Sequence, residues 1–287
     1  MEFYAFFKYG YKYKNKWLPL HYMAINYRHI QEFDEMFPSV THFITTRYGG
    51  VSKGNYAELN MGKWCGDCPA CVQSNRQHLC QSLGISEDLL LVPREIHKTH
   101  NVIIDNDFLC MPFSDRTSLL MEADALITTI PNVAIAVSTA DCVPVLLYDA
   151  KYKVAAAIHA GWRGIIGGIL YKTNETLNNL FDNDVSQRHF IIGPCIAGCN
   201  YEIKNDVWQQ FCKTFTSDEQ KKILTKQTSE NFYPELRTAV TLQLENIVDK
   251  KQIHQYIADT FTNKDFYSVR RDGQNTGRFL TGIMLQQ

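Results

Sequence analysis

The sequence has no run of about 20 consecutive apolar residues, which a membrane-spanning helix needs, although 45% of its 287 residues are hydrophobic. Neither charge is in excess, since the formal net charge is −1, so we expect neither nucleic acid nor a membrane as partner. The first residues contain no continuous apolar segment, which argues against a secretory leader. We therefore expect a cytoplasmic protein whose nine cysteines are reduced and available for metal binding or catalysis.

Internal repeats and long linkers are also missing. Residues 1–35 are polar and aromatic without a clear period, and we interpret them as an N-terminal extension before a domain of residues 36–287. In that domain short apolar segments alternate with amphipathic ones, which predicts a single α/β domain with a mixed β-sheet flanked by helices. The predicted helices include 72–83, 165–180, 206–214 and 239–248, and the predicted strands include 40–46, 89–92, 255–258, 266–270 and 279–285.

Two predicted buried strands each contain one side chain that can bind a metal. Cys142 interrupts the apolar segment 138–149, and His159 interrupts the segment 154–164. With His97 from a third strand, they form a set of ligands typical of catalytic zinc, which keeps one position open for a water and lowers its pKa to ~7. Asp141, beside Cys142, would orient a ligand or act as general base.

The spacing of Cys142 and His159 leaves other interpretations open, and taken alone it favours a role in the apolar core for both residues. Cys142 would then be a buried thiol and His159 a hydrogen-bonded core histidine. A third hypothesis is a thiol hydrolase, with Cys142 as nucleophile, His159 as base and the amides of residues 193–198 as oxyanion donors. His100 lies three residues after His97, on the opposite face of a strand, so at most one of them is expected in a given site.

A glycine-rich turn, residues 47–54, carries Arg47 and Lys53. Glycines allow backbone N–H groups to approach an anion, and an arginine beside them can bind phosphate or carboxylate with two hydrogen bonds. Arg163 is a second candidate for holding an anionic group. The alternative for residues 47–54 is an ordinary hairpin turn.

Cysteines are concentrated in one short stretch. Cys65, Cys68 and Cys71 form a C-x2-C-x2-C pattern, and Cys80 follows nearby. Four thiols could hold a structural zinc or an iron–sulfur cluster, but zinc ribbons pair two separated C-x2-C units and the sequence has no second unit. Because the pattern leads directly into a helix, we favour free or packing thiols.

Several short motifs follow one another along the chain. They are Thr45-Thr-Arg-Tyr-Gly-Gly-Val-Ser52, Leu59-Asn-Met-Gly62, Asn75-Arg76, Ser138-Thr-Ala-Asp-Cys-Val-Pro-Val-Leu, His159-Ala-Gly-Trp-Arg-Gly164, Ile192-Gly-Pro-Cys-Ile196, Phe266-Tyr-Ser-Val-Arg-Arg271 and Thr276-Gly-Arg278. With these motifs the sequence resembles, over roughly residues 36–287, the laccase-domain family, which is multicopper-oxidase-like and whose members are also described as purine nucleoside phosphorylases.

The resemblance implies a zinc site in a surface cleft of a mixed α/β domain, with His97, Cys142 and His159 as ligands. It implies phosphorolysis of adenosine, inosine, guanosine and methylthioadenosine, and deamination of adenosine, with purine nucleoside and phosphate as partners. The older description of the family implies a copper-dependent polyphenol oxidase, and copper can also bind such ligands. We expect catalytic roles for Asp141, Cys142 and His159, and substrate-binding roles for Arg47, Ser52, Asn60, Arg163 and Arg278.

Four positions depart from the family pattern. Glu95 replaces a glutamine, Glu235 an aspartate, Val240 an asparagine and Asp259 a cysteine, while Cys68 and Cys71 are additions. The three expected ligands are intact, so metal binding is the firmer expectation. The departures leave a non-catalytic binding protein as a further alternative.

Overall fold

The computed structural model describes residues 12–13, 16–17, 25 and 27–287. Strands β1 (Lys12–Tyr13) and β2 (Lys16–Trp17) form a separate two-stranded ribbon. Most of the predicted extension, residues 1–35, lies outside the described residues, and its described part includes helix α1 (Gln31–Met36). None of the helices in the described part is long and apolar enough to cross a membrane.

The larger sheet has six strands and is mixed. Its middle pairs are antiparallel, whereas the pairs at both edges are parallel. The strand order is β14 (Ile253–Gln255), β10 (Arg188–Ile192), β8 (Val143–Asp149), β9 (Val154–Ala160), β6 (Ala125–Thr128) and β5 (Asn101–Ile104).

A four-stranded sheet packs face to face against the first. Its order is β3 (Val40–Ile44), β15 (Phe279–Leu285), β7 (Ala134–Thr139) and β4 (Leu90–Leu91). Leu146 and Ala157 from the larger sheet share one apolar cluster with Ile135 and Ile283 from the smaller one. Strands covered on both faces need apolar side chains in both directions, which explains the continuous apolar run of β9.

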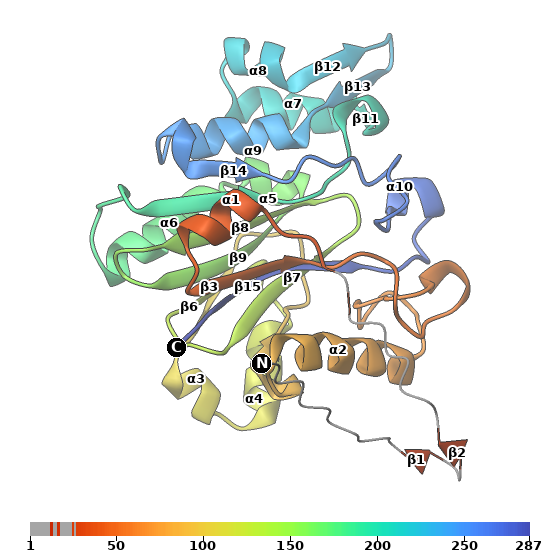
Figure 1. The fold of residues 1–287 in the computed structure, drawn as a ribbon. Coiled ribbons are helices and arrows are strands. Elements are labelled where there is room, and N and C mark those ends of the chain that lie inside the picture. The colour runs from red at the N-terminus through yellow and green to blue at the C-terminus, as the bar shows by residue number, and fades with distance from the viewer. Residues whose placement is uncertain (1–11, 14–15, 18–24, 26) are drawn as a thin grey trace, which may run out of the picture.

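Helices complete a layered arrangement on the two outer faces (Figure 1). Helices α6 (Ile169–Leu180) and α9 (Leu236–Glu245) pack on the larger sheet, and α2 (Pro69–Leu83) packs on the smaller one. The remaining α-helices are α3 (Asn106–Cys110), α4 (Phe113–Leu120), α5 (Trp162–Ile166), α7 (Asn205–Thr214), α8 (Ser217–Ile223) and α10 (Val269–Asp272). A small third sheet has the order β11 (Ile203–Lys204), β13 (Asn231–Pro234) and β12 (Leu224–Gln227).

The predicted mixed α/β class is confirmed, but several predicted elements are wrong. The helix expected over 165–180 is two helices, because Gly168 adopts a left-handed φ of 76° and ends the first helical path. Residues 266–270 form no strand; Ser268 instead caps α10 by accepting a hydrogen bond from the Arg271 N–H. The late strand expected over 255–258 lies earlier, as β14.

Candidate metal centre

The structure brings together His97, Cys142 and His159, although they are far apart in sequence. Their ligand atoms all lie within 4.8 Å of one another, and within the described part of the chain they form the one His, Cys and acidic group that could hold a metal ion. Cys142 Sγ lies 3.9 Å from His97 Nε2. A tetrahedral zinc with bonds of about 2.0–2.3 Å holds its ligand atoms about 3.5 Å apart, so the cluster needs only a small contraction to fit it.

Antiparallel pairing explains how two of these side chains meet. Strands β8 and β9 align Val143 with Ala160, so Cys142, just before β8, emerges beside the end of β9 where His159 lies. His97 does not come from a strand, as the sequence predicted, but from the loop between β4 and β5. Its left-handed φ of 59° turns this loop sharply beside the other two ligands.

Asp124 is the residue that orients two of the three ligands, and it was missed in the sequence. One carboxylate oxygen lies 2.9 Å from His159 Nδ1 and accepts a hydrogen bond of 2.8 Å from the His97 backbone N–H. The other oxygen accepts from the Lys98 N–H at 2.7 Å. Because the carboxylate binds Nδ1 of His159, that ring is left with Nε2 free for a metal, an arrangement typical of metal-binding histidines.

Electrostatics favour a thiolate at Cys142. Burial by itself would raise the pKa of this thiol, but His159 and His97 outweigh burial and lower the pKa to about 6. Burial would likewise lower the pKa of His159, yet the Cys142 thiolate and Asp124 raise it to about 10. In the metal-free chain the two groups therefore form a thiolate–imidazolium pair, and a metal would take the place of the shared proton.

Gly161 leaves a space at the centre of the three ligands. A Cβ added to this residue would contact all three of their side chains, at 3.1 Å from His97 Cδ2, 3.2 Å from Cys142 Sγ and 3.4 Å from His159 Cε1. Any residue can adopt the backbone φ of −70° found at Gly161. The backbone conformation therefore does not require a glycine here, but the lack of room for a side chain among the three ligands does. This small gap between a thiolate and two imidazoles fits a metal ion.

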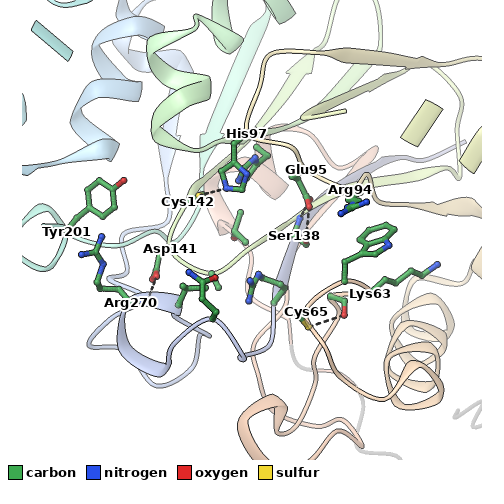
Figure 2. A pocket seen from close by; sticks show the side chains of 18 residues that line it. Lys63, Cys65, Arg94, Glu95, His97, Ser138, Asp141, Cys142, Tyr201 and Arg270 are labelled. Atoms are coloured by element: carbon green, nitrogen blue, oxygen red, sulfur yellow. Dashed lines mark hydrogen bonds between the residues drawn. The ribbon is translucent and has the colours of Figure 1, made fainter. Parts of the chain in front are cut away.

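The ligands line a cavity of about 390 Å³ that is also lined by charged and aromatic side chains (Figure 2). Four cationic side chains, Lys63, Arg94, Arg270 and Arg278, outnumber the two carboxyl groups of Glu95 and Asp141. Aromatic surface comes from Trp64 and Tyr201. Most of these residues were not predicted from the sequence, because they lie on loops or, for Arg270, on the short helix α10, where no spacing pattern marks them. The cavity therefore combines a metal-binding group, an excess of positive charge and aromatic rings.

Asp141 lies in the cavity wall and is held by several hydrogen bonds. Its carboxylate accepts from Thr260 Oγ1 at 2.7 Å and from the Arg270 N–H at 2.7 Å. Burial raises the pKa of Asp141, although the hydrogen bonds from Ser268, Arg270 and Thr260 oppose that effect. Its φ of 112° is a strained conformation for a residue with a side chain.

Arg278 is the one predicted substrate-binding residue among those that line the cavity. Asn60 is buried behind it and accepts a hydrogen bond of 2.8 Å from the Arg278 backbone N–H. Ser52 donates to Asp67 at 2.6 Å, further from the cavity.

The two remaining predicted anion-binding arginines point elsewhere. Arg47 donates to the carbonyl of Ala57 at 3.0 Å, and Arg163 lies over the Trp162 ring at 4.2 Å; neither lines the cavity. In the glycine-rich turn, the Gly49 N–H donates to the Glu58 carboxylate at 2.9 Å, so a carboxylate of the protein itself occupies a place predicted for a bound anion.

Of the four departures from the family pattern, Glu95 reaches the cavity. Its carboxylate accepts from the Ser138 N–H at 2.6 Å, and burial raises its pKa. Val240 is fully buried in the apolar core. Glu235 and Asp259 accept backbone hydrogen bonds from Gly198 and Ala197 respectively, so both stabilise the loop after β10.

The chain is similar to known proteins in both sequence and fold. Residues 41–286 match the family described as multi-copper polyphenol oxidoreductase laccase. A purine nucleoside phosphorylase of Bacteroides thetaiotaomicron is 33% identical over 88% of this chain and 93% of its own length. A protein named adenosine deaminase RL5, from an unknown prokaryotic organism, is 28% identical over 88% of this chain and 96% of its own length.

Solved structures with the same fold cover nearly the whole domain. The hypothetical protein YfiH of Bacillus licheniformis has a TM-score of 0.79 and 25% identity, over 88% of this chain and 95% of its own. YlmD of Geobacillus stearothermophilus has a TM-score of 0.78 and 26% identity, over 88% of this chain and 93% of its own.

Proposed function

This chain belongs to the multi-copper polyphenol oxidoreductase laccase family, and on that premise we propose that it is a zinc-dependent enzyme of purine nucleosides. Its reactions are phosphorolysis of adenosine, inosine, guanosine and methylthioadenosine, and deamination of adenosine. The convergence of His97, Cys142 and His159 in a positively charged cavity is the observation that carries this proposal. Relatives named purine nucleoside phosphorylase and adenosine deaminase support nucleoside chemistry.

The three ligand side chains suit zinc and also accept copper, because thiolate and imidazole bind both ions. A bound zinc would act as a Lewis acid and lower the pKa of a water at its open position. Asp124 holds His159 and the His97 loop in the orientation that presents their free nitrogens. Asp124 therefore acts as a positioning residue.

The cationic lining is matched to phosphate. Arg278 is fixed by hydrogen bonds from its guanidinium to the carbonyls of Thr276 and Gly277, and its backbone is held by Asn60. A guanidinium held in one orientation binds a phosphate with little loss of entropy, and it neutralises negative charge during the reaction. Arg94 and Lys63 also line the cavity and add to this positive field (Figure 2).

Two carboxyl groups are suited to proton transfer. Burial raises the pKa of both Glu95 and Asp141, which brings each closer to the range in which a carboxyl group can both hold and release a proton. Asp141 lies beside Cys142 in sequence, and we assign it the transfer of a proton to or from the purine base. The exposed Trp64 ring offers a face on which that base can stack.

Product analysis tests the proposal. Zinc-loaded protein is incubated with adenosine, with and without phosphate, and free base, ribose 1-phosphate and inosine are separated by chromatography. We expect adenine and ribose 1-phosphate only when phosphate is present, and inosine in both cases. A Cys142→Ala variant should lose both activities, whereas Cys110→Ala, at an exposed cysteine on α3, should retain them. Absence of all these products from the zinc-loaded wild type would refute the proposal.

A thiol hydrolase is a second candidate, because Cys142 and His159 form a thiolate–imidazolium pair. The two candidates differ in their dependence on metal. A hydrolase keeps its activity after chelation and loses it after thiol alkylation, whereas the zinc enzyme loses its activity on chelation and regains it on addition of zinc.

A further inference from the structure

The C-x2-C-x2-C stretch at the start of α2 is not used by the candidate metal centre. Cys68 is the N-cap residue of α2, Pro69 is its first residue, and Cys71 lies in its first turn. Cys68 is exposed and Cys71 is partly exposed, and both are free thiols. The pair therefore has the spacing Cys-Pro-Ala-Cys at a helix N-terminus, open to solvent.

The two thiols of this pair are in contact. The Cys71 N–H donates to the Cys68 carbonyl at 3.0 Å, and the Cys71 thiol hydrogen-bonds to the sulfur of Cys68. Residues three apart on a helix have Cα atoms about 5 Å apart, inside the range of about 4.4–6.8 Å that a disulfide spans. A cross-link between them requires only that their side chains rotate.

The other cysteines of the stretch are directed elsewhere. The Cys65 thiol donates to the Gly62 carbonyl at 3.2 Å and accepts from Asn60 Nδ2 at 3.2 Å. Cys80 is buried, and burial raises the pKa of its thiol to about 12. Within the described residues no second metal-binding group involves these thiols, which leaves Cys68 and Cys71 as an isolated pair.

We propose that Cys68 and Cys71 form a redox-active dithiol that is converted to a disulfide by exchange with low-molecular-weight disulfides. Cys68 is the attacking residue, because the N–H groups of Cys71 and Ala70 and the thiol of Cys71 stabilise its thiolate and lower its pKa. Cys71 is the resolving residue, because its thiol donates to Cys68 and its pKa is raised.

The exchange balances in two steps. The Cys68 thiolate attacks one sulfur of the small disulfide, forms a mixed disulfide and releases one small thiolate. Cys71 then loses its proton to that thiolate and attacks the Cys68 sulfur, which closes the 68–71 bond and releases the second small thiolate. This thiolate takes up from solvent the proton that Cys68 had lost. The protein dithiol is oxidised by two electrons, and the small disulfide is reduced to two thiols.

This dithiol is joined to the cavity by a short chain of hydrogen bonds. The Cys68 N–H donates to Asp67 Oδ1 at 2.7 Å, and Asn60 Nδ2 donates to Asp67 Oδ2 at 2.9 Å. Asn60 in turn accepts from the Arg278 N–H. Three hydrogen bonds therefore connect the first turn of α2 to the backbone of Arg278, which lines the cavity.

The test uses full-length, zinc-loaded protein equilibrated in buffers of reduced and oxidised glutathione, then alkylated and digested. The tryptic peptide from Trp64 to Arg76 carries three cysteines, Cys65, Cys68 and Cys71. We expect it to lose two alkylation sites together, to retain alkylated Cys65, and to show a 68–71 disulfide in fragment spectra. Addition of excess dithiothreitol should restore both sites.

Two variants separate the roles of the thiols. In Cys71→Ser, glutathione should remain attached to Cys68, because no resolving thiol is present. In Cys68→Ser, Cys71 should take up glutathione several-fold more slowly than Cys68 does in Cys71→Ser. The exposed Cys110 and Cys199 serve as internal references. The proposal is overturned if the pair oxidises no more readily than these references, if Cys65 takes part in the bond, or if the wild type accumulates glutathione on Cys68.

Discussion

Two regions of this chain contain potential metal ligands. In one region the ligands are close in sequence but form no metal site, and in the other they are far apart in sequence but close in space. Four cysteines lie within residues 65–80, yet no three potential ligands of this stretch come close enough together to hold a metal ion. His97, Cys142 and His159 are separated by long stretches of sequence, yet their ligand atoms lie within 4.8 Å of one another. A metal site requires side chains that converge in space. The ends of neighbouring strands bring together residues from distant parts of the sequence, whereas the N-terminus of one helix does not.

The physical difference lies in what directs each side chain. In the cysteine stretch, a helix sends successive side chains to different faces, so Cys80 is buried while Cys68 is exposed. At the metal centre, the β8–β9 register and the Asp124 carboxylate direct the ligands inward. Variants that act on one region and spare the other can test this contrast.

The largest expected effect is the loss of bound metal in Cys142→Ala. Removal of the thiolate takes away one of three ligands, so the metal content of zinc-loaded protein should fall from about one ion per chain to near zero. Cys68→Ala is the matched control in the other region, outside the cavity, and should keep its metal. Plasma emission spectrometry after gel filtration measures both. Equal metal loss in the two variants would reverse the contrast between the regions.

Gly161→Ala should weaken metal binding nearly as much while keeping every ligand. The new methyl group would occupy the space among His97, Cys142 and His159, and we expect at least about a 100-fold loss of zinc affinity, or about 2.7 kcal/mol. The free energy of unfolding of the metal-free variant should stay within about 1 kcal/mol of the wild type. Competition with a chromophoric chelator and urea unfolding measure the two quantities. Unchanged affinity would place the ion away from Gly161.

Asp124→Asn should have an intermediate effect. The amide has one acceptor oxygen instead of two, so it cannot accept from His159, the His97 N–H and the Lys98 N–H together. Loss of such a partner costs about 10- to 100-fold in metal affinity. Competition with the chromophoric chelator measures the zinc affinity of this variant. Asp67→Asn, at a partly buried hydrogen-bond junction of the cysteine region, is the control, and its metal affinity should not change.

The smallest expected effect concerns the stability of the junction between the two regions. Asp67→Asn replaces one oxygen that accepts from Ser52 and Asn60, and it should cost about 1 kcal/mol in the free energy of unfolding. Urea unfolding measures this change. A loss of more than about 3 kcal/mol would show that Asp67 supports far more of the fold than one hydrogen-bond junction.

Local patterns in the sequence predicted much of the fold. The helix over 206–214 and the strand over 279–285 were confirmed, because their apolar periodicity continues over the whole element. The break before α6 and the short helix α10 were missed, since a left-handed glycine and a serine cap override the apolar pattern at those positions. The placement of the extension and domain boundary stays a prediction.

The candidate site could be predicted in part. The resemblance to a family pointed to His97, Cys142 and His159, which the structure brings together; spacing alone favoured a core role for Cys142 and His159. Asp124 could not be predicted, because it binds backbone N–H groups whose positions depend on a loop conformation. The assigned roles of Asp141, Arg47, Arg163 and Arg278 remain predictions.

The shared carboxylate of Asp124 has a consequence for hydrogen exchange. The His97 and Lys98 amides lie in a loop outside any helix or sheet ladder, where exchange with solvent is ordinarily fast. Both donate to a carboxylate that is fully buried beside β6. Exchange of either proton requires the loop to separate from this buried carboxylate, so these two protons should exchange far more slowly than other loop amides.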